Sequence, residues 1–341
     1  MKIAVCGDVH YCVNSSVIRS RGEKYSTRIE NCIKSINWFE QEITTKCDLV
    51  VYLGDFFDSP VLNDEIITSL KDIEWNKSLV HFFLVGNHES SVGSLEYNSA
   101  KDLESDQFKI ISEPFYFGIC GLFFLPYITE DNRRSLQEYV KDIRPRILFS
   151  HNDLKGVQMG AITSKTGFDL EDILSNSDLY VNGHIHNGSW VIKDRILNLG
   201  NLTGQNFGED GYVYNHNVAI IDTDTLNVEF IKNPYAFNFY KFEVNTIDEF
   251  NAYMNKIKNK PSSIVSVKCN ENILKDVNQE LKKSNLVCSK VISFSNNNYT
   301  TTECVDDFTV DHLDEFKKFC LVNIGNNDTV ISELNEVCRW I

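Results

Sequence analysis

The stretch KIAVCGDVH, residues 2–10, joins an apolar run directly to a polar loop. Residues 2–6 are mostly apolar at successive positions, which is typical of a strand buried on both faces within a sheet. Gly7, Asp8 and His10 follow this run without a spacer. In open α/β sheets, ligands bind in the crevice beyond the carboxyl ends of the strands. The stretch therefore predicts a buried strand whose end carries functional side chains.

The same pattern recurs four times between residues 48 and 186. Each further apolar run leads at once into a loop rich in Gly, Asp, Asn or His: Asp48–Leu53 into Gly54–Asp58, Leu79–Val85 into Gly86–Glu89, Arg146–Phe149 into Ser150–Asp153, and Asp178–Val181 into Asn182–His186. Stretches between the strands predict helices at Thr27–Ile43, Asn63–Trp75, Asn132–Asp142 and Asp169–Leu174. This βαβ rhythm predicts an α/β fold with a mostly parallel sheet and helices outside it.

Short adjacent strands separated by turn residues replace this rhythm at about residues 114–125 and 189–230. They suggest a second sheet with antiparallel pairs. After residue 188 these strands are expected at Trp190–Ile192, Ile196–Leu199, Tyr212–Tyr214, Val218–Asp222 and Val228–Ile231.

A boundary is expected near Pro234, which divides the chain into a large domain (1–234), a small domain (235–303) and a terminal segment (304–341). The small domain is predicted to be a β-α-β-α-β unit that ends in a polar spacer. Its strands are expected at Phe239–Val244, Ser263–Cys269 and Val287–Ser295, and its helices at Ile247–Ile257 and Glu271–Lys283. The terminal segment is predicted to form two helices, Asp311–Val322 and Thr329–Trp340.

The composition is that of an ordinary soluble globular protein, with 42% hydrophobic and 24% charged residues in 341. Its net charge of −15 argues against a nucleic-acid coat protein, because non-specific DNA affinity comes from Lys and Arg neutralising phosphates. It does not exclude an enzyme that reaches DNA through a local site. No run approaches the roughly 18 apolar residues of a transmembrane helix. The ten cysteines show no CxxC pair and predict reduced thiols. A cytoplasmic protein with no membrane partner is therefore expected.

Five of the eight histidines lie in the five strand-end loops. Carboxylate, amide oxygen and imidazole together favour manganese, iron or zinc, and the lack of thiolates disfavours a structural zinc site. Asp55 is a carboxylate that could bridge two metals. A bridged pair roughly 3.5–4 Å apart binds a phosphoryl group and makes hydroxide from water.

Each motif taken alone has an ordinary alternative. Asp8 would cap a strand-end turn, Asp58 would cap a helix, and His151 would be a hydrogen-bonded core histidine. His184 and His186 instead point the same way in an extended segment, which favours a ligand pair even in isolation. The ordinary alternatives together require five coincidences at five strand ends, so a metal site is the better interpretation.

Taken in order, the five loops resemble those of the calcineurin-like metallophosphoesterase superfamily over about residues 1–200. The resemblance implies a two-sheet sandwich flanked by helices, with two divalent metal ions, manganese being the expected metal. His88 would contact the scissile phosphate and act as the acid toward the leaving oxygen. The resemblance also implies that metal one is held by Asp8, His10, Asp55 and His186, and metal two by Asp55, Asn87, His151 and His184.

Residues 199–209, which end in Phe207-Gly208-Glu209, are similar to the segment after the last motif in SbcD-type nuclease subunits of double-strand-break repair, including those of tailed phages. Asn201 stands where that group has Ser, so the match is partial. The Ser/Thr phosphatase branch is disfavoured, because Tyr11 follows His10 where those enzymes have Gly.

This second resemblance implies 3′-to-5′ exonuclease activity on duplex DNA ends and endonuclease activity on single strands, in a bacterial or phage-infected cell. It also implies a small C-terminal α+β capping domain, and terminal helices that dock onto an SMC-like (SbcC-type) ATPase. Simple packing of those helices on the capping domain is the alternative. A homodimer is a further expected assembly.

The rival function is a stand-alone phosphodiesterase for nucleotides or other small phosphoesters. A non-catalytic scaffold is disfavoured, because none of the expected ligands is missing. The chain has no Walker-type loop, so any ATP dependence would come from another chain.

Several residues are candidates for substrate contact. Asp58 replaces a His that assists phosphate contact in some relatives; an ionised Asp cannot donate a proton, so His88 would be the sole histidine acid. A basic loop near the first motif could hold a DNA backbone, although such loops are usually just solvated. Its residues are Arg19, Arg21, Lys24 and Arg28, and Phe207 and Glu209 are added from the resemblance.

Overall fold

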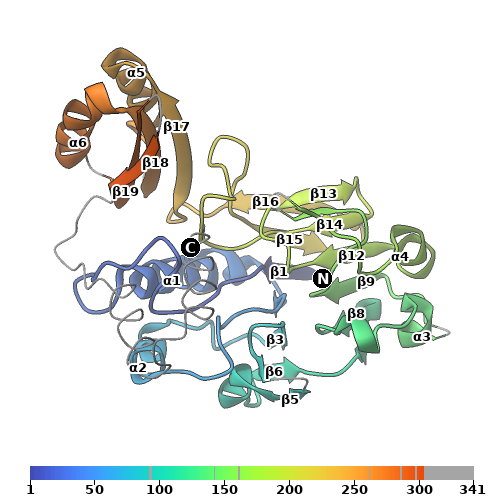
Figure 1. Cartoon of the computed structure of the whole chain (residues 1–341). Helices are drawn as coiled ribbons and strands as arrows, with labels where there is room; N and C mark the ends of the chain where they lie inside the picture. Colours follow the sequence, from blue (N-terminus) through green and yellow to red (C-terminus); the bar gives the residue numbers. More distant parts are fainter. Residues whose placement is uncertain are drawn as a thin grey trace, which may run out of the picture. The chain divides into compact units, whose positions relative to one another are not determined.

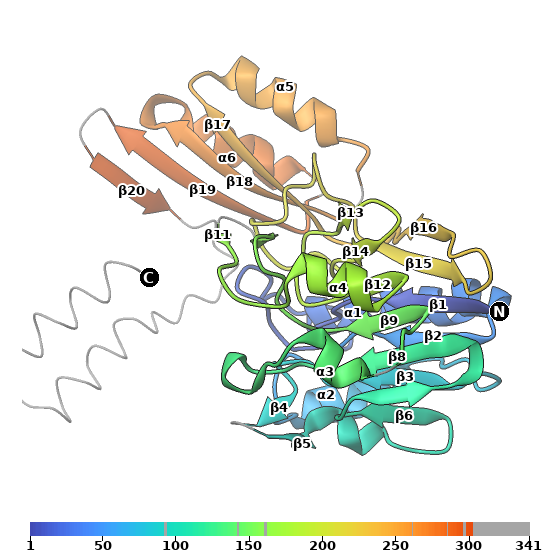
Figure 2. The same cartoon turned by 90° about the vertical axis from the view of Figure 1, so that its right-hand side faces the viewer.

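The computed structural model describes residues 1–91, 94–141, 143–159, 162–260, 262–284, 286–295 and 298–302. Figures 1 and 2 show them in two views, coloured along the chain. Two six-stranded sheets form the framework of the first 232 residues. Two hairpins accompany them, β4 (Ser90–Ser91) with β5 (Ser94–Asn98) and β10 (Gln158–Met159) with β11 (Ile162–Thr163).

The first sheet has the order β16-β15-β1-β2-β3-β6. Four of its strands are parallel, and β15 and β16 add an antiparallel pair at the β1 edge. The strands are β1 (Lys2–Cys6), β2 (Leu49–Tyr52), β3 (His81–Leu84), β6 (Phe108–Ile111), β15 (Asn217–Asp222) and β16 (Val228–Lys232).

The second sheet has the order β13-β14-β12-β9-β8-β7. Its four inner strands are parallel, and β13 and β7 are antiparallel edges. The strands are β7 (Phe115–Phe117), β8 (Leu122–Leu125), β9 (Ile147–Ser150), β12 (Leu179–Asn182), β13 (Ser189–Ile192) and β14 (Ile196–Asn198).

The two sheets pack face to face and carry helices on their outer faces. Ile3 and Val5 of β1 pack against Phe149 of β9 and Val181 of β12 in the core between the sheets, whereas Ala4 packs in the outer core with helix α1. Successive strand residues point to opposite faces, so a strand covered on both sides is apolar throughout. The outer helices are α1 (Thr27–Trp38), α2 (Asp64–Ser69), α3 (Leu136–Val140) and α4 (Leu170–Asn176).

Four expectations about these elements need correction. The five predicted strands do not share one sheet: β1, β2 and β3 lie in the first and β9 and β12 in the second. The antiparallel strands do not form a sheet of their own, because they extend the edges of both. Tyr212–Tyr214 is a turn, held by Tyr214 N donating to the carbonyl of Asp210. Helices α2 and α3 are also shorter than predicted.

Residues 238–302 form the predicted β-α-β-α-β unit with one strand more. Its sheet has the order β17-β18-β19-β20, with only β20 antiparallel, and β20 occupies part of the expected polar spacer. The expected boundary at Pro234 falls between β16 and β17, and both terminal helices lie outside the described residues. The elements are β17 (Asn238–Val244), α5 (Ile247–Ile257), β18 (Ser263–Asn270), α6 (Leu274–Lys283), β19 (Cys288–Ser295) and β20 (Asn298–Thr302).

Helices in the described part of the chain are all too short or too polar to cross a bilayer. Six cysteines there are free thiols, of which four are buried.

Candidate metal centre

The predicted ligands come from loops at the ends of five strands, and several have a strained backbone. Asp8 and His10 follow β1, Asp55 follows β2, and His184 follows β12. His10, Asp55 and His184 have φ of 48°, 47° and 71°, a left-handed conformation that non-glycine residues rarely adopt. Such strain clusters at functional sites, where the surrounding structure imposes it.

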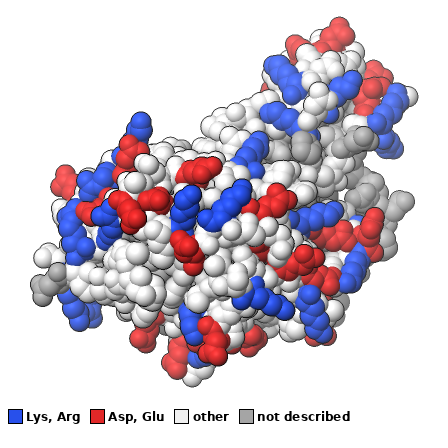
Figure 3. All heavy atoms as spheres, turned by 180° about the vertical axis from the view of Figure 1, so that it is seen from behind, with Lys and Arg blue, Asp and Glu red and all other residues white. Residues whose placement is uncertain are grey.

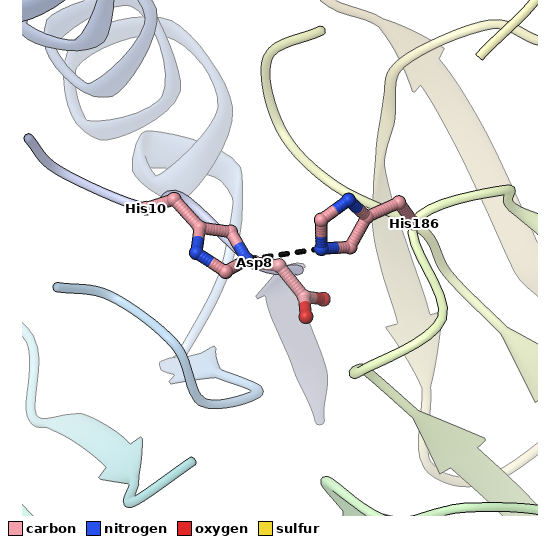
Figure 4. Close-up of side chains that lie close together, drawn as sticks. All are labelled: Asp8, His10 and His186. Atoms are coloured by element: carbon pink, nitrogen blue, oxygen red, sulfur yellow. Dashed lines mark hydrogen bonds between the residues drawn. The ribbon is translucent and has the colours of Figure 1, made fainter. Parts of the chain in front are cut away.

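Asp8, His10 and His186 form the first cluster (Figure 4). The two rings point toward each other from different loops, with Nε2 of His10 3.0 Å from Nε2 of His186. Oδ2 of Asp8 is buried without a hydrogen-bond partner among the described residues. A buried carboxylate oxygen is costly unless it is paired or binds a cation.

Carboxylates behind this cluster set the orientation of both rings. Oδ1 of Asp58 lies 2.7 Å from Nδ1 of His10, and Oε1 of Glu209 lies 3.3 Å from Nδ1 of His186. An ionised carboxylate only accepts, so each Nδ1 donates and each neutral ring presents the Nε2 lone pair to the cluster. Two facing lone pairs repel each other unless a proton or a metal ion lies between them.

Asp55, Asn87, His151 and His184 form the second cluster. Oδ1 of Asn87 lies 3.2 Å from Nε2 of His151 and 2.9 Å from Nδ1 of His184. The other nitrogen of each ring is tethered: His151 Nδ1 donates to the carbonyl of Leu53 at 2.8 Å, and His184 Nε2 lies 3.1 Å from Asp153. All four histidines therefore direct one nitrogen inward and anchor the other outside.

Asp55 joins the two clusters. Its Oδ2 lies 3.1 Å from His151 Nε2 and 3.7 Å from His10 Nε2, and its Oδ1 accepts from the backbone N–H of His88. The structure thus brings together all seven predicted ligands. Their imidazole, carboxylate and amide groups are ligands that divalent cations accept. A cation bound among them would also satisfy the unpaired oxygen of Asp8 and the two facing Nε2 atoms.

His88 lies at the open side of the centre. Its side chain is 42% exposed, and its ring meets that of His10 edge to face at 4.7 Å. The Asp58 carboxylate, 3.4 Å from His88 Nδ1, raises the pKa of His88 to about 9, although burial opposes this. Burial alone would raise the pKa of Asp58, but contacts with His10 and His88 outweigh it and lower that pKa. Asp58 therefore serves two histidines at once.

The basic residues predicted to contact DNA differ in exposure and in ion pairing. Arg19 is exposed, and Arg21 is exposed but bonded to Glu65 at 2.7 and 2.9 Å. Lys24 is likewise paired with Asp72. Arg28 is fully buried, so its proposed contact with a DNA backbone was wrong.

Arg28 instead holds the first ligand loop from inside. Its guanidinium donates to the carbonyls of Val9 and His10 and to Thr203 and Gly204. A helical amphipathic pattern does not distinguish such an inward Arg from a solvated one.

Phe207 and Glu209 both face the interior. The ring of Phe207 lies 5.2 Å from that of Phe239, and Glu209 is 2% exposed and accepts from Gln205 N as well as contacting His186. Burial raises the pKa of Glu209, but His186 outweighs it and lowers that pKa. Their placement favours support of the site over direct contact with substrate.

Glu89 was not singled out from the sequence as a site residue. It is fully buried and accepts four backbone N–H groups: those of Gly86, Asp55, Phe56 and Phe57, at 2.7, 3.1, 2.5 and 3.1 Å. One carboxylate thus ties the Asp55 loop to the Asn87 loop. Its position directly after Asn87-His88 was the available signal.

Comparison with known proteins agrees with this geometry. The family model of calcineurin-like phosphoesterases matches residues 1–188, which is more than half of the chain. A search among curated proteins found no match. The matched region contains both clusters and all five strand-end loops. The chain therefore belongs to the calcineurin-like phosphoesterase family of metal-dependent phosphoester hydrolases.

Proposed function

We propose that this protein is a two-metal-dependent DNA nuclease that works as the nuclease subunit of a repair or recombination complex with an SMC-like ATPase. The observation that carries the hydrolytic part is the pair of ligand clusters joined by Asp55, with His88 on their open side. The nuclease part is supported by the likeness of residues 199–209 to SbcD-type subunits and by the β-α-β-α-β unit that follows.

Each residue at the centre has a distinct task in this proposal. Divalent cations bound there, with manganese expected, supply positive charge that polarises a phosphoryl group and acidifies water. Asp55 holds the two sites in register, and Asn87 and the histidines fix the position of the phosphate. His88 donates a proton to the departing sugar oxygen, and Asp58 orients it.

The distribution of charged residues on the surface bears on where DNA would bind. On the face shown in Figure 3, Lys and Arg are interspersed with Asp and Glu, without an extended basic area. A net charge of −15 gives weak non-specific attraction to phosphates. We therefore place recognition at the metal centre and its rim, helped by Arg19, by the ATPase partner and by a second copy of the chain.

The decisive experiment compares wild type with His88→Ala on linear duplex DNA in Mn²⁺. We expect wild type to degrade the DNA from its 3′ ends and His88→Ala to lose about 10²–10⁴-fold in rate, the usual contribution of a general acid. Bound Mn²⁺ should be similar in both proteins. Equal cleavage by the two proteins would refute the role of His88.

The rival candidate, a stand-alone phosphodiesterase, shares the same centre. It would hydrolyse bis(p-nitrophenyl) phosphate but leave duplex DNA intact, with or without ATP. Co-expression with an SMC-like ATPase separates the two proposals, since only the repair nuclease should copurify with it and cut DNA in an ATP-dependent way.

A further inference from the structure

A cavity of about 310 Å³ opens in the segment that follows β8. One part of its lining is apolar or aromatic: Pro126, Tyr127, Ile128 and Tyr139. Ser90, of hairpin strand β4, also lines it. We call this cavity the Tyr127 pocket. Its volume lies at the lower end of the roughly 300–1,000 Å³ typical of small-molecule sites.

The pocket borders the second ligand cluster. The ring of Tyr127 lies 5.8 Å from that of His184 and 6.5 Å from that of His151. Ser90, which also lines the pocket, stands two residues after His88 in the sequence. Tyr127, one lining residue of the pocket, therefore lies next to the predicted ligands His184 and His151.

The wall of the pocket is tied to both sheets. Tyr127 N donates to the carbonyl of Val85, at the end of β3, and Ile128 N donates to Oδ1 of Asn152, which follows His151. The two hydrogen bonds thus tie the wall to segments that adjoin predicted ligands, one through a backbone carbonyl and one through a side chain. A ligand would meet a preformed surface, which lowers the entropic cost of binding.

The lining of the pocket also includes polar and charged side chains. Arg134 is exposed, and no carboxylate lies within ion-pair distance of it among the described residues, whereas its neighbour Arg133 is bonded to Glu130. Asn132 and Thr129 offer hydrogen-bonding groups, and Glu113 adds one negative charge. The free guanidinium of Arg134 suits a second phosphate in this pocket.

We propose that the Tyr127 pocket binds the nucleoside attached to the scissile phosphate, with its base against Tyr127 and the next phosphate at Arg134. This rests on the proposed phosphodiester hydrolysis and names the substrate class as a nucleotide chain. An aromatic surface accepts any base, because every base has a π-face. The pocket therefore selects nucleotides over other phosphodiesters without selecting sequence.

The test measures binding to the Mn²⁺-loaded full chain by calorimetry. The three ligands are inorganic phosphate, thymidine 5′-monophosphate and the 5′-phosphorylated dinucleotide pTpT. Wild type should bind the mononucleotide about 5 to 150 times more tightly than phosphate, since stacking is worth about 1–3 kcal/mol per base. It should bind pTpT more tightly still.

Two variants and one control resolve the pocket. Tyr127→Ala should remove most of the preference for the mononucleotide over phosphate, and Arg134→Ala should remove the added affinity of pTpT. Tyr116→Ala, a 40% exposed tyrosine on β7 outside the pocket, should keep both preferences. Equal affinities of wild type for phosphate and the mononucleotide, or preferences unchanged in Tyr127→Ala, would overturn the proposal.

Hydrolysis of bis(p-nitrophenyl) phosphate is measured in parallel with wild type. If the wild type does not hydrolyse this substrate but still prefers the mononucleotide over phosphate, the proposed function is refuted and the pocket is not. Activity without nucleotide preference would refute the pocket alone.

Discussion

At the scale of single residues, the centre is organised by the groups behind the predicted ligands. Asp58, Glu209, Asp153 and the carbonyl of Leu53 each hold the outer nitrogen of one histidine. Such partners fix the tautomer and the orientation of a ligand ring. Asn201 accepts from His216 Nδ1 at 2.7 Å, and Nε2 of His216 lies 3.9 Å from Glu209, so Asn201 belongs to the same buried network.

Glu209 gives the clearest test of this arrangement. We expect Glu209→Ala to weaken Mn²⁺ binding by about 10–100-fold, the usual effect of losing a partner of a ligand histidine. Glu209→Gln still has an acceptor oxygen and should recover part of the affinity. Calorimetric Mn²⁺ titration measures both. A DNA-binding defect with normal Mn²⁺ affinity in Glu209→Ala would instead favour the predicted substrate contact.

Gly54 tests the close packing at the centre. It has φ of 105°, and a Cβ there would lie 2.5 Å from His151 Nδ1. Gly156 also has a positive φ, 82°, but a Cβ would meet nothing within 4 Å. We expect Gly156→Ala to cost about 1 kcal/mol in the free energy of unfolding and Gly54→Ala about 2 kcal/mol more, from overpacking. Urea denaturation measures both, and equal costs would contradict the predicted clash.

At the scale of elements, helix α1 does more than cover the first sheet. Its N-terminus is capped by Ser26, whose side chain accepts from Ile29 N, and Arg28 in the first turn reaches inward to the His10 loop. The helix thereby supports the ligand loop that directly precedes it in the chain. A buried guanidinium that donates mostly to carbonyls stabilises the folded state only because those hydrogen bonds offset its loss of hydration.

Arg28→Met is expected to lower the free energy of unfolding by about 3 kcal/mol, because several buried acceptors lose a charged donor. Lys34→Met, at an exposed position on the same helix, should change it by less than about 0.5 kcal/mol. Denaturant unfolding of the metal-free proteins makes the comparison. A stability of Arg28→Met equal to that of Lys34→Met would show that Arg28 is not a clamp.

At the scale of the whole molecule, metal binding should be coupled to stability. A ligand that binds only the folded state stabilises it by about 2.7 kcal/mol per site at a free concentration a hundredfold above Kd. We expect Mn²⁺ to raise the Tm of the wild type and to raise that of Asp55→Asn far less, because Asp55 faces both clusters. Asp106→Asn, an exposed turn carboxylate, should respond like wild type. Calorimetric scans measure all three, and equal responses to Mn²⁺ would contradict a bridging Asp55.

The sequence alone was enough to predict most strands of the two large sheets, the five ligand loops and most of the small C-terminal unit. These are local properties: an apolar run covered on both faces and the Gly, Asp and His that follow it are adjacent along the chain. The predicted metal ligands could be identified from the sequence for the same reason. The bounds of β1, α5 and β19 also lie close to those that their patterns predict.

Tertiary structure decided which strands share a sheet, which arginine turns inward and which carboxylates support the histidines. Those relations join residues far apart in the chain: Asp58 lies 48 positions from His10, and Arg28 lies 175 from Thr203. Periodicity carries no information about such pairs, because it reports which face of an element is buried and not what covers it. The contacts among loops from both sheets set the geometry of the centre and of the Tyr127 pocket, and only the folded chain brings these loops together.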